Sequence, residues 1–319
     1  MFRRGLVLCL TLATVASLAA CSQSSPATTL EPRKPVSIVN CGFTVPLDSP
    51  PKRVITIKST STEMLLALGL GDRIVGTAFQ DGPLPKSLEP SKPLPVLAEK
   101  VPSEEVVLNA TPDFVYAGWE SNFSADGAGT REDLAGLGIR TYVSPAACKE
   151  PQFKPEKLSF EEIESEIRQI AQIFGVDPSE VIKSQRSILK SIHKDNRGLT
   201  ALWFSSGSDT PYVGAGIGAP QLIMDTIGLQ NIAADIKDTW SSFSWESVIA
   251  ADPDVIVLVD ASWSSMQKKI GVLESNPATA KLKAVREHRY LIVPFAASEA
   301  GVRTASAAAD LAKQLAALP

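Results

Sequence analysis

The sequence predicts an α/β fold of two similar lobes with a ligand cleft between them. Three observations support this prediction. Strand-like and helix-like segments alternate in both halves of the chain. Between Ser159 and His193 the pattern is purely helical. An eleven-residue segment that starts at Glu105 recurs at Glu246, and both copies run through a Pro-Asp pair into a strand-like run. The 319 residues suffice for two cores of ordinary domain size.

The amino terminus has the pattern of a secretory signal. Two arginines precede an apolar run, Gly5 to Ala20, that is too short for a stable membrane span. Leu18-Ala19-Ala20-Cys21 is similar to the lipobox of bacterial lipoproteins, whose cysteine carries diacylglycerol. An ordinary signal peptide that contains a cysteine is the alternative. We expect a lipoprotein signal peptide at residues 1–20 and a lipidated flexible tether at 21–35. The remainder is then held at the extracytoplasmic face of the cell membrane by lipid.

The cysteine count follows from this leader. Cys9 leaves with the signal peptide and Cys21 carries the lipid, so Cys41 and Cys148 remain. Two thiols in an exported domain favour one disulfide, and two isolated buried cysteines are the alternative.

Charge and histidine content exclude several classes of function. The formal net charge is −4, and it becomes −6 (29 basic against 35 acidic residues) once the two leader arginines are removed. This balance disfavours nucleic-acid binding, which needs a basic surface. The two histidines, His193 and His288, are too few for a His-rich metal site. We therefore expect no resident metal and no cofactor.

The first half contains a hairpin and then alternating strands and helices. A hydroxyl-rich turn, Ser59 to Thr62, separates the first β-branched run from a run of good helix formers that ends at a glycine. The predicted elements are a hairpin at 36–47, strands at 53–57, 73–78, 113–117 and 140–143, and a helix at 64–69.

The middle and the second half complete the pattern. Apolar residues at helical spacing predict helices at 160–174 and about 177–193, with Gly175 between them. Further strands are predicted at 200–204, 254–259 and 290–293, and helices at 221–227 and 304–317. These elements indicate an N-terminal lobe at 36–175, a connecting helix at 176–194 and a C-terminal lobe at 195–319.

Aromatic and hydroxyl side chains gather in the loops that should border the cleft. Tryptophans in such loops can stack on a planar ligand. The glycine-rich segment before the 221–227 helix can bring backbone N–H groups close to a phosphate or carboxylate, although its spacing is not that of a dinucleotide site. The candidate ligand-binding residues are Ser59, Thr60, Phe79, Trp119, Glu120, Tyr212, Gly214, Gly216, Trp240, Trp263 and Phe295.

No catalytic constellation stands out in the sequence. An exported α/β hydrolase is the competing hypothesis, but it would need a nucleophile elbow G-x-S-x-G, which the sequence lacks. The sequence therefore predicts a binding protein rather than an enzyme.

Three segments resemble the substrate-binding proteins of ABC importers, in the class III group for siderophores, cobalamin and haem. They are Pro51 to Ile57, Ser61 to Gly76 and Ala251 to Ile256. The resemblance implies two Rossmann-like lobes joined by a long rigid helix. It also implies a monomer that captures a bulky metal-chelate or cofactor-like ligand and delivers it to a permease and its ATPase. In that family a glutamate on each lobe docks the permease, and Glu63 and Glu246 match these positions.

Within that class the chain is similar to an actinobacterial subgroup described as carriers of a deazaflavin coenzyme precursor. The similarity rests on Ile57 to Glu63, Tyr116 to Gly129 and Tyr212 to Pro220. A planar deazaflavin suits the tryptophans, and its phosphodiester suits the glycine-rich segment. A ferric siderophore, cobalamin or haem is the alternative, and haem ligation through histidine is disfavoured because neither histidine lies in a cleft loop.

Overall fold

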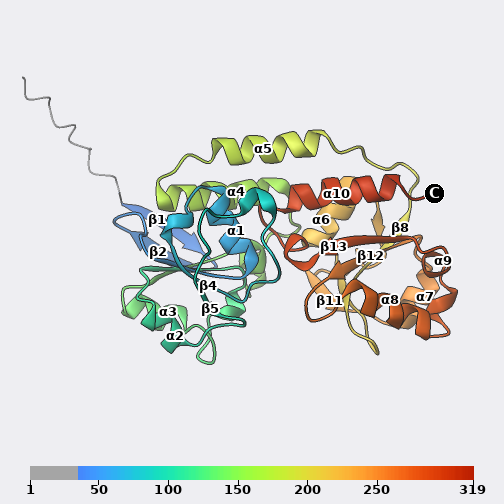
Figure 1. Cartoon of the computed structure of the whole chain (residues 1–319), viewed down its shortest axis with the longest axis horizontal. Coiled ribbons are helices and arrows are strands. Elements are labelled where there is room, and N and C mark those ends of the chain that lie inside the picture. The colour runs from blue at the N-terminus through green and yellow to red at the C-terminus, as the bar shows by residue number, and fades with distance from the viewer. Residues whose placement is uncertain (1–34) are drawn as a thin grey trace, which may run out of the picture. The chain divides into compact units, whose positions relative to one another are not determined.

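Two large β-sheets and a two-stranded hairpin organise residues 35–319, the part of the chain that the computed structural model describes (Figure 1). One sheet has five strands and is entirely parallel, and the other has six strands and is mixed. Helices accompany each sheet, so the predicted α/β class with two lobes is confirmed. The predictions for residues 1–34, including the signal peptide and the lipidated Cys21, lie outside the described residues.

The first lobe is built on the strand order β5-β4-β3-β6-β7. The chain starts at the central strand β3, adds β4 and β5 on one side, and then adds β6 and β7 on the other. All residues of β3 and β6 are buried, as expected of parallel strands covered on both faces. The elements are β1 (Val36–Asn40), β2 (Phe43–Leu47), β3 (Val54–Ile57), α1 (Ser59–Ala67), β4 (Ile74–Ala78), β5 (Val96–Ala98), α2 (Glu104–Asn109), β6 (Phe114–Ala117), α3 (Arg131–Gly136) and β7 (Arg140–Val143).

The second lobe combines parallel and antiparallel strands. Strands β8, β12 and β13 are parallel, with the largely buried β8 and β12 at the centre and β13 at one edge, while β9 and β11 add antiparallel strands at the other edge. The sequence did not predict that edge, because strands of three residues are too short to show an alternating pattern. The elements are β8 (Thr200–Ser206), β9 (Tyr212–Gly214), α6 (Ala219–Ile227), β10 (Gln230–Asn231), β11 (Trp240–Ser242), α7 (Trp245–Ala251), β12 (Val255–Asp260), α8 (Met266–Ser275), α9 (Lys283–Arg286), β13 (Tyr290–Pro294) and α10 (Thr304–Ala316).

The internal repeat has the same structural role in both lobes. Each copy is a short helix, α2 or α7, followed by a left-handed residue and then a buried strand. The left-handed residues are Thr111 and Asp252, with φ of +46° and +38°. The aspartates of the two Pro-Asp pairs accept hydrogen bonds from backbone N–H groups at the start of the neighbouring strand. These bonds are 2.8 and 2.9 Å long at Asp113 and 3.0 Å long at Asp254. The repeat thus fixes the register between adjacent parallel strands.

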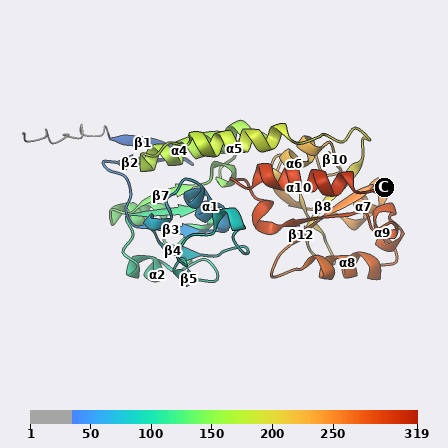
Figure 2. The ribbon, with the colours of Figure 1, turned by 45° about the horizontal axis from the view of Figure 1, so that its top comes forward.

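Helices α4 (Phe160–Phe174) and α5 (Ser179–Lys190) lead the chain from the first sheet to the second. Ser159 caps the start of α4, and Gly175, with φ of +69°, ends it. The Arg186 guanidinium donates two hydrogen bonds of 2.6 Å each to the Glu164 carboxylate and so ties α5 to α4. Helix α5 also packs against α10 of the second lobe, and Figure 2 shows α4 and α5 along one edge of the molecule.

Helix α1 begins five residues earlier than the sequence predicted. The hydroxyl residues from Ser59 to Thr62 form its first turn instead of a separate loop. Ser61 Oγ donates to the carbonyls of Ile57 and Lys58, at 2.8 and 2.9 Å, so these side chains bond to the backbone of their own turn. Consequently Glu63 lies one turn inside the helix and not at its exposed start.

A buried acid lies between α4 and the first sheet. Glu166 accepts a hydrogen bond from the Tyr116 hydroxyl at 2.6 Å and one from Ser144 Oγ at 3.2 Å. Burial raises the pKa of the Glu166 carboxyl to about 7, against the opposing effect of these two hydrogen bonds. The folded protein therefore binds this proton more tightly than the unfolded chain does.

Glu166→Gln should remove a pH dependence of stability. Because the folded pKa lies above the unfolded value, the contribution of Glu166 is complete below about pH 4.5 and is lost as the pH rises through about 7. The stability of the wild type relative to Glu166→Gln should fall by about 3 kcal/mol over this interval. Urea unfolding of both proteins at pH 4.5, 6 and 8 measures this difference in stability. Glu161→Gln, on the exposed side of α4, should match the wild type at each pH, and a flat difference for Glu166→Gln would contradict the assignment.

Candidate ligand-binding site

The topology of the first lobe places two chain turns side by side. Strands β3 and β6 are neighbours, and the chain leaves them toward opposite sides of the sheet. In open α/β sheets, ligands bind outside the carboxyl ends of the strands at such a reversal of strand order. Here the ends of β3 and β6 carry Thr60 and Trp119.

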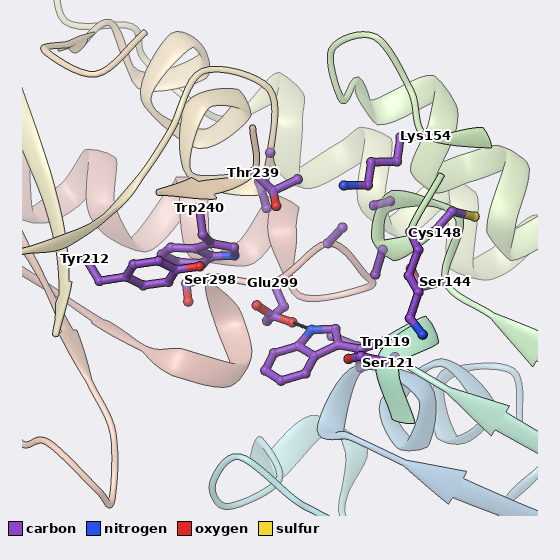
Figure 3. A pocket seen from close by; sticks show the side chains of 18 residues that line it. Trp119, Ser121, Ser144, Cys148, Lys154, Tyr212, Thr239, Trp240, Ser298 and Glu299 are labelled. Atoms are coloured by element: carbon purple, nitrogen blue, oxygen red, sulfur yellow. Dashed lines mark hydrogen bonds between the residues drawn. The ribbon is translucent and has the colours of Figure 1, made fainter. Parts of the chain in front are cut away.

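A cavity of about 300 Å³ opens at this edge and is shared by the two lobes (Figure 3). The first lobe contributes the ends of β3 and β6 and the loop that follows β7. The second lobe contributes β9, β11, the start of α6 and the segment after β13. The lining residues are Thr60, Gly118, Trp119, Ser121, Ser144, Ala146, Ala147, Cys148, Lys149, Lys154, Tyr212, Gly218, Ala219, Thr239, Trp240, Ser298, Glu299 and Ala300.

Aromatic rings form two sides of the cavity. In the second lobe Tyr212 stacks on Trp240 with ring centroids 6.4 Å apart and planes at 13°. The antiparallel pairing of β9 with β11 sets this stack, because Tyr212 and Trp240 lie on neighbouring strands. Trp119 of the first lobe faces them, as Figure 3 shows. Phe295 lies behind the lining and contacts both Trp240 and Trp119, with centroids 6.1 and 6.4 Å away. This arrangement suits a flat or apolar ligand group.

Glu299 is a buried carboxylate in the wall of this cavity. The residue is 7% exposed and accepts a hydrogen bond from the Trp119 indole N–H of the other lobe. Burial raises the pKa of the Glu299 carboxyl to about 7, while Lys58 and the indole groups of Trp119 and Trp240 act in the opposite direction. One carboxylate thus joins aromatic residues from both lobes.

A buried ion pair supports the Trp119 ring. Lys58 and Asp81 form a salt bridge with both side chains fully buried. The Lys58 Nζ lies 3.7 Å from the centroid of the Trp119 ring and 4.4 Å from that of Phe79. Lys58 also adopts a left-handed backbone with φ of +85°. A strained, non-glycine residue with a buried charge is typical of a functional site, and here it holds the aromatic wall in place.

Gly118 allows the close approach that positions Trp119. A Cβ atom at this residue would lie 2.6 Å from Thr60 Oγ1 and 2.8 Å from Lys58 Cβ. Any other residue would push the β6 end away from the start of α1. The glycine therefore brings Thr60 and Trp119 into one wall.

The sequence-predicted ligand residues fall into two groups in the structure. Thr60, Trp119, Tyr212 and Trp240 line the cavity. The other seven do not. Ser59, Phe79 and Phe295 are packed behind the lining residues. Glu120 accepts a hydrogen bond from the Lys149 backbone N–H, and the backbones of Gly214 and Gly216 pair with neighbouring segments. The Trp263 side chain contacts Phe295 but is 49% exposed.

Sequence reasoning missed several residues of the cavity. Glu299 and Ser298 follow the predicted strand at 290–293. The only sequence feature that could have identified them is that they are polar residues after the last predicted strand. Ser144 and Lys154 belong to the loop after β7, which carries no motif. Thr239 precedes β11, a strand that the sequence did not reveal.

The predicted disulfide is confirmed. Cys41 and Cys148 are bonded, with their α-carbons 5.4 Å apart, within the 4.4–6.8 Å range that a disulfide requires. The bond ties the β1–β2 turn to the loop after β7, which lines the cavity. Within residues 35–319 the one cluster of potential metal ligands is Cys41, Glu120 and Cys148, and the disulfide occupies both thiols.

The two glutamates expected to dock a permease lie in different settings. Glu246 is exposed in the first turn of α7. Glu63 is 1% exposed, and Arg303 of the second lobe donates two hydrogen bonds to its carboxylate, at 2.7 and 2.5 Å. A buried, ion-paired carboxylate is not available to a partner surface, so Glu63 does not fit the docking role. Glu63 is buried because α1 begins at Ser59, which places Glu63 inside the helix and not at its exposed start.

Comparison with known proteins identifies the family. The model of the periplasmic binding protein family matches residues 54–297, which span both lobes and the helices between them. The chain belongs to the periplasmic binding protein family. Members of this family bind ligands, in agreement with a cavity lined by aromatic and hydroxyl groups. Among the described helices of this periplasmic binding protein, none is both long enough and apolar enough to cross a bilayer.

Two relatives cover most of the chain. An uncharacterized ABC transporter substrate-binding lipoprotein of Bacillus subtilis, YvrC, is 26% identical over 281 residues, which are 85% of this chain and 82% of the relative. A vitamin B12-binding protein of Vibrio parahaemolyticus is 24% identical over 240 residues, which are 72% of this chain and 80% of the relative.

Solved structures share the two-lobe fold. A periplasmic binding protein from Veillonella parvula has a TM-score of 0.77 and 26% identity, covering 88% of this chain and 97% of its own. A protein of an ABC-type Fe3+-hydroxamate transport system from Saccharomonospora viridis has a TM-score of 0.75 and 23% identity, covering 89% and 100%. The second likeness concerns the fold alone.

Proposed function

We propose that this periplasmic binding protein is the extracytoplasmic substrate-binding component of an ABC importer and delivers a bulky organic ligand to the permease and its ATPase. The observation that carries the proposal is the cavity between the lobes, which Trp119 and Trp240 border from opposite sides. A relative named for vitamin B12 binding supports a ligand of the cobalamin class, and a ferric siderophore or haem is the alternative that the sequence resemblance implies. A hydrolase receives no such support, since the family consists of binding proteins.

The size of the cavity restricts how such a ligand binds. About 300 Å³ is at the lower end for drug-sized ligands, so part of a bulky ligand enters and the rest stays at the cleft mouth. Both histidines, His193 and His288, are exposed and neither lines the cavity, so a haem would not be held through histidine. The narrower hypothesis of a deazaflavin precursor rests on the sequence segments and tryptophans described above, and the names of the relatives given above lend it no support.

Anchoring at the membrane is part of the proposal. We infer from the lipobox that Cys21 carries the lipid and that a short tether links it to the first strand of the binding unit. The substrate-binding lipoprotein of Bacillus subtilis among the relatives supports this arrangement. The binding unit would act as a monomer on the outer surface of the membrane.

For permease docking we propose the pair Glu105 and Glu246. The internal repeat aligns these two residues at an offset of 141 positions, and it aligns the serine caps Ser103 and Ser244 in the same way. Both glutamates are exposed in the first turn of their helices, where the helix dipole favours a carboxylate. Each lobe would then present one carboxylate to an arginine of the permease, which sets orientation more than affinity.

Uptake measurements test the proposal. With 57Co-cyanocobalamin and 55Fe-ferrichrome as probes, cells whose own copy is replaced by Glu105→Ala/Glu246→Ala should take up the transported probe about tenfold more slowly. The Kd for that probe and the melting temperature should stay at wild-type values, because both carboxylates are exposed. Glu161→Ala, an exposed glutamate on α4, is the matched control. Normal uptake by the double variant would contradict the docking pair, and no uptake of either probe by the wild type would contradict the ligand class.

A further inference from the structure

The cavity carries opposite charges on two of its sides. Glu299 lies between the indoles of Trp119 and Trp240, and Lys154 of the loop after β7 belongs to the same lining. In Figure 3 the Lys154 side chain extends from the first lobe with its terminal nitrogen toward the interior of the cavity. An acidic and a basic group on two sides of one small cavity constrain which ligand group fits between them.

Lys154 is held in the wall without a partner for its charge. The residue is half-buried, whereas Lys149, the other cation of the lining, is exposed. Among residues 35–319, no carboxylate lies within ion-pair distance of the Lys154 ammonium group, while Lys157 nearby pairs with Asp225 at 2.7 Å. An ammonium group without a counter-ion attracts an anionic group.

Glu299 has acceptor capacity that the protein does not fill. A carboxylate offers about four lone-pair sites, and the indole N–H group of Trp119 occupies one of them. Lys58, the nearest buried cation, is already engaged by Asp81 and by the aromatic rings above it. A carboxylate that is nine-tenths buried gains most from a further donor, which a ligand in the cavity can supply.

We infer that the ligand group entering this cavity is a flat or apolar body with a hydrogen-bond donor or positive charge at one end, bound by Glu299, and an acidic substituent at the other, bound by Lys154. The inference rests on the proposed function and specifies the chemistry of its ligand. The aromatic walls bind the body of the group, and the two charges determine its orientation. A neutral group of the same shape leaves Lys154 without a counter-ion and Glu299 without a further donor, and it binds more weakly.

Four para-substituted benzenes of similar shape test this inference without knowledge of the natural ligand. They are 4-(aminomethyl)benzoate with both charges, 4-methylbenzylamine with the positive charge, 4-methylbenzoate with the negative charge, and p-xylene with neither. Calorimetry on the full chain in detergent should give the lowest Kd for the doubly charged probe and the highest for p-xylene. The Kd of each singly charged probe should lie between them, about tenfold from either.

Single substitutions in the cavity should show which residue binds the amine end of a probe and which binds its carboxylate end. Glu299→Gln should weaken both amine probes about tenfold and leave 4-methylbenzoate unchanged. Lys154→Met should weaken both carboxylate probes by a similar factor and leave 4-methylbenzylamine unchanged. The matched controls are Glu89→Gln and Lys190→Met, which remove the same charges from exposed positions outside the cavity.

Three results would overturn the inference: equal affinity of the wild type for all four probes, no binding of any of them at millimolar concentration, or pocket variants that behave like the controls. None of these results affects the uptake of cobalamin or ferrichrome. The proposed function and the polarity of the ligand can therefore fail separately.

Discussion

Glu63→Ala should lower the free energy of unfolding by about 3–5 kcal/mol, because it leaves the Arg303 guanidinium buried without its partner. The side chains of Glu63 and Arg303 are 1% and 12% exposed, and they belong to different lobes. Arg303 also donates to the Pro83 carbonyl at 3.0 Å, so the pair fixes the segment before α10 against two points of the first lobe. Urea unfolding monitored by circular dichroism measures the loss.

The double variant Glu63→Leu/Arg303→Met provides the control for this prediction. Replacing both ions by apolar side chains removes the unpaired charge, so its stability should return to within about 1 kcal/mol of the wild type. Such a recovery would show that the loss in Glu63→Ala comes from the unpaired Arg303 charge. A loss below about 1 kcal/mol in Glu63→Ala would contradict the role of this pair in joining the lobes.

Removal of the disulfide should lower the free energy of unfolding by a similar amount, because it releases a constraint on the unfolded chain. The Cys41–Cys148 bond spans a sequence separation of 107 residues, and closing a loop of that length restricts the unfolded chain. Cys41→Ser/Cys148→Ser should therefore lower the free energy of unfolding by about 4–5 kcal/mol. Guanidinium unfolding of the oxidised protein, the reduced protein and the double variant measures this.

The same variant should also loosen one wall of the cavity. Cys148 and Lys149 lie in the loop after β7, which has no strand or α-helix between the end of β7 and α4. Amide hydrogen exchange in residues 144–158 should be faster in the double variant than in the wild type, with the strands of the first sheet unchanged. Equal stability of the oxidised wild type and the variant would contradict the prediction.

The fold followed from the sequence because its strongest signals are local. The β-branched run before Lys58, the amphipathic pattern up to Gly175 and the repeated Pro-Asp pair each reflect contacts between near neighbours or a repeated motif. Strands β9 and β11 were missed because their pairing, Tyr212 opposite Ser242, joins residues that carry no local pattern.

The candidate site was predictable where a residue type implied its position. Trp119 and Trp240 were predicted as aromatic residues in loops that border the cleft, and both line the cavity. Glu299 was not, since an acid after a strand is common, and its significance comes from Trp119, which is 180 positions away in the sequence. Glu63 was misplaced for the same reason, because its partner Arg303 lies 240 positions away.

The most direct test of the account is a binding measurement on the cavity itself. Native mass spectrometry and fluorescence titration of the full chain with cyanocobalamin, ferrichrome, ferrioxamine B and haemin should detect a one-to-one complex with at least one of these four probes. Trp119→Ala and Trp240→Ala should each raise the Kd for that probe about tenfold or more. Trp263→Ala, which removes an exposed ring outside the lining, should change it much less. A protein that binds none of the four probes, or whose affinity is the same in all three variants as in the wild type, would contradict the account.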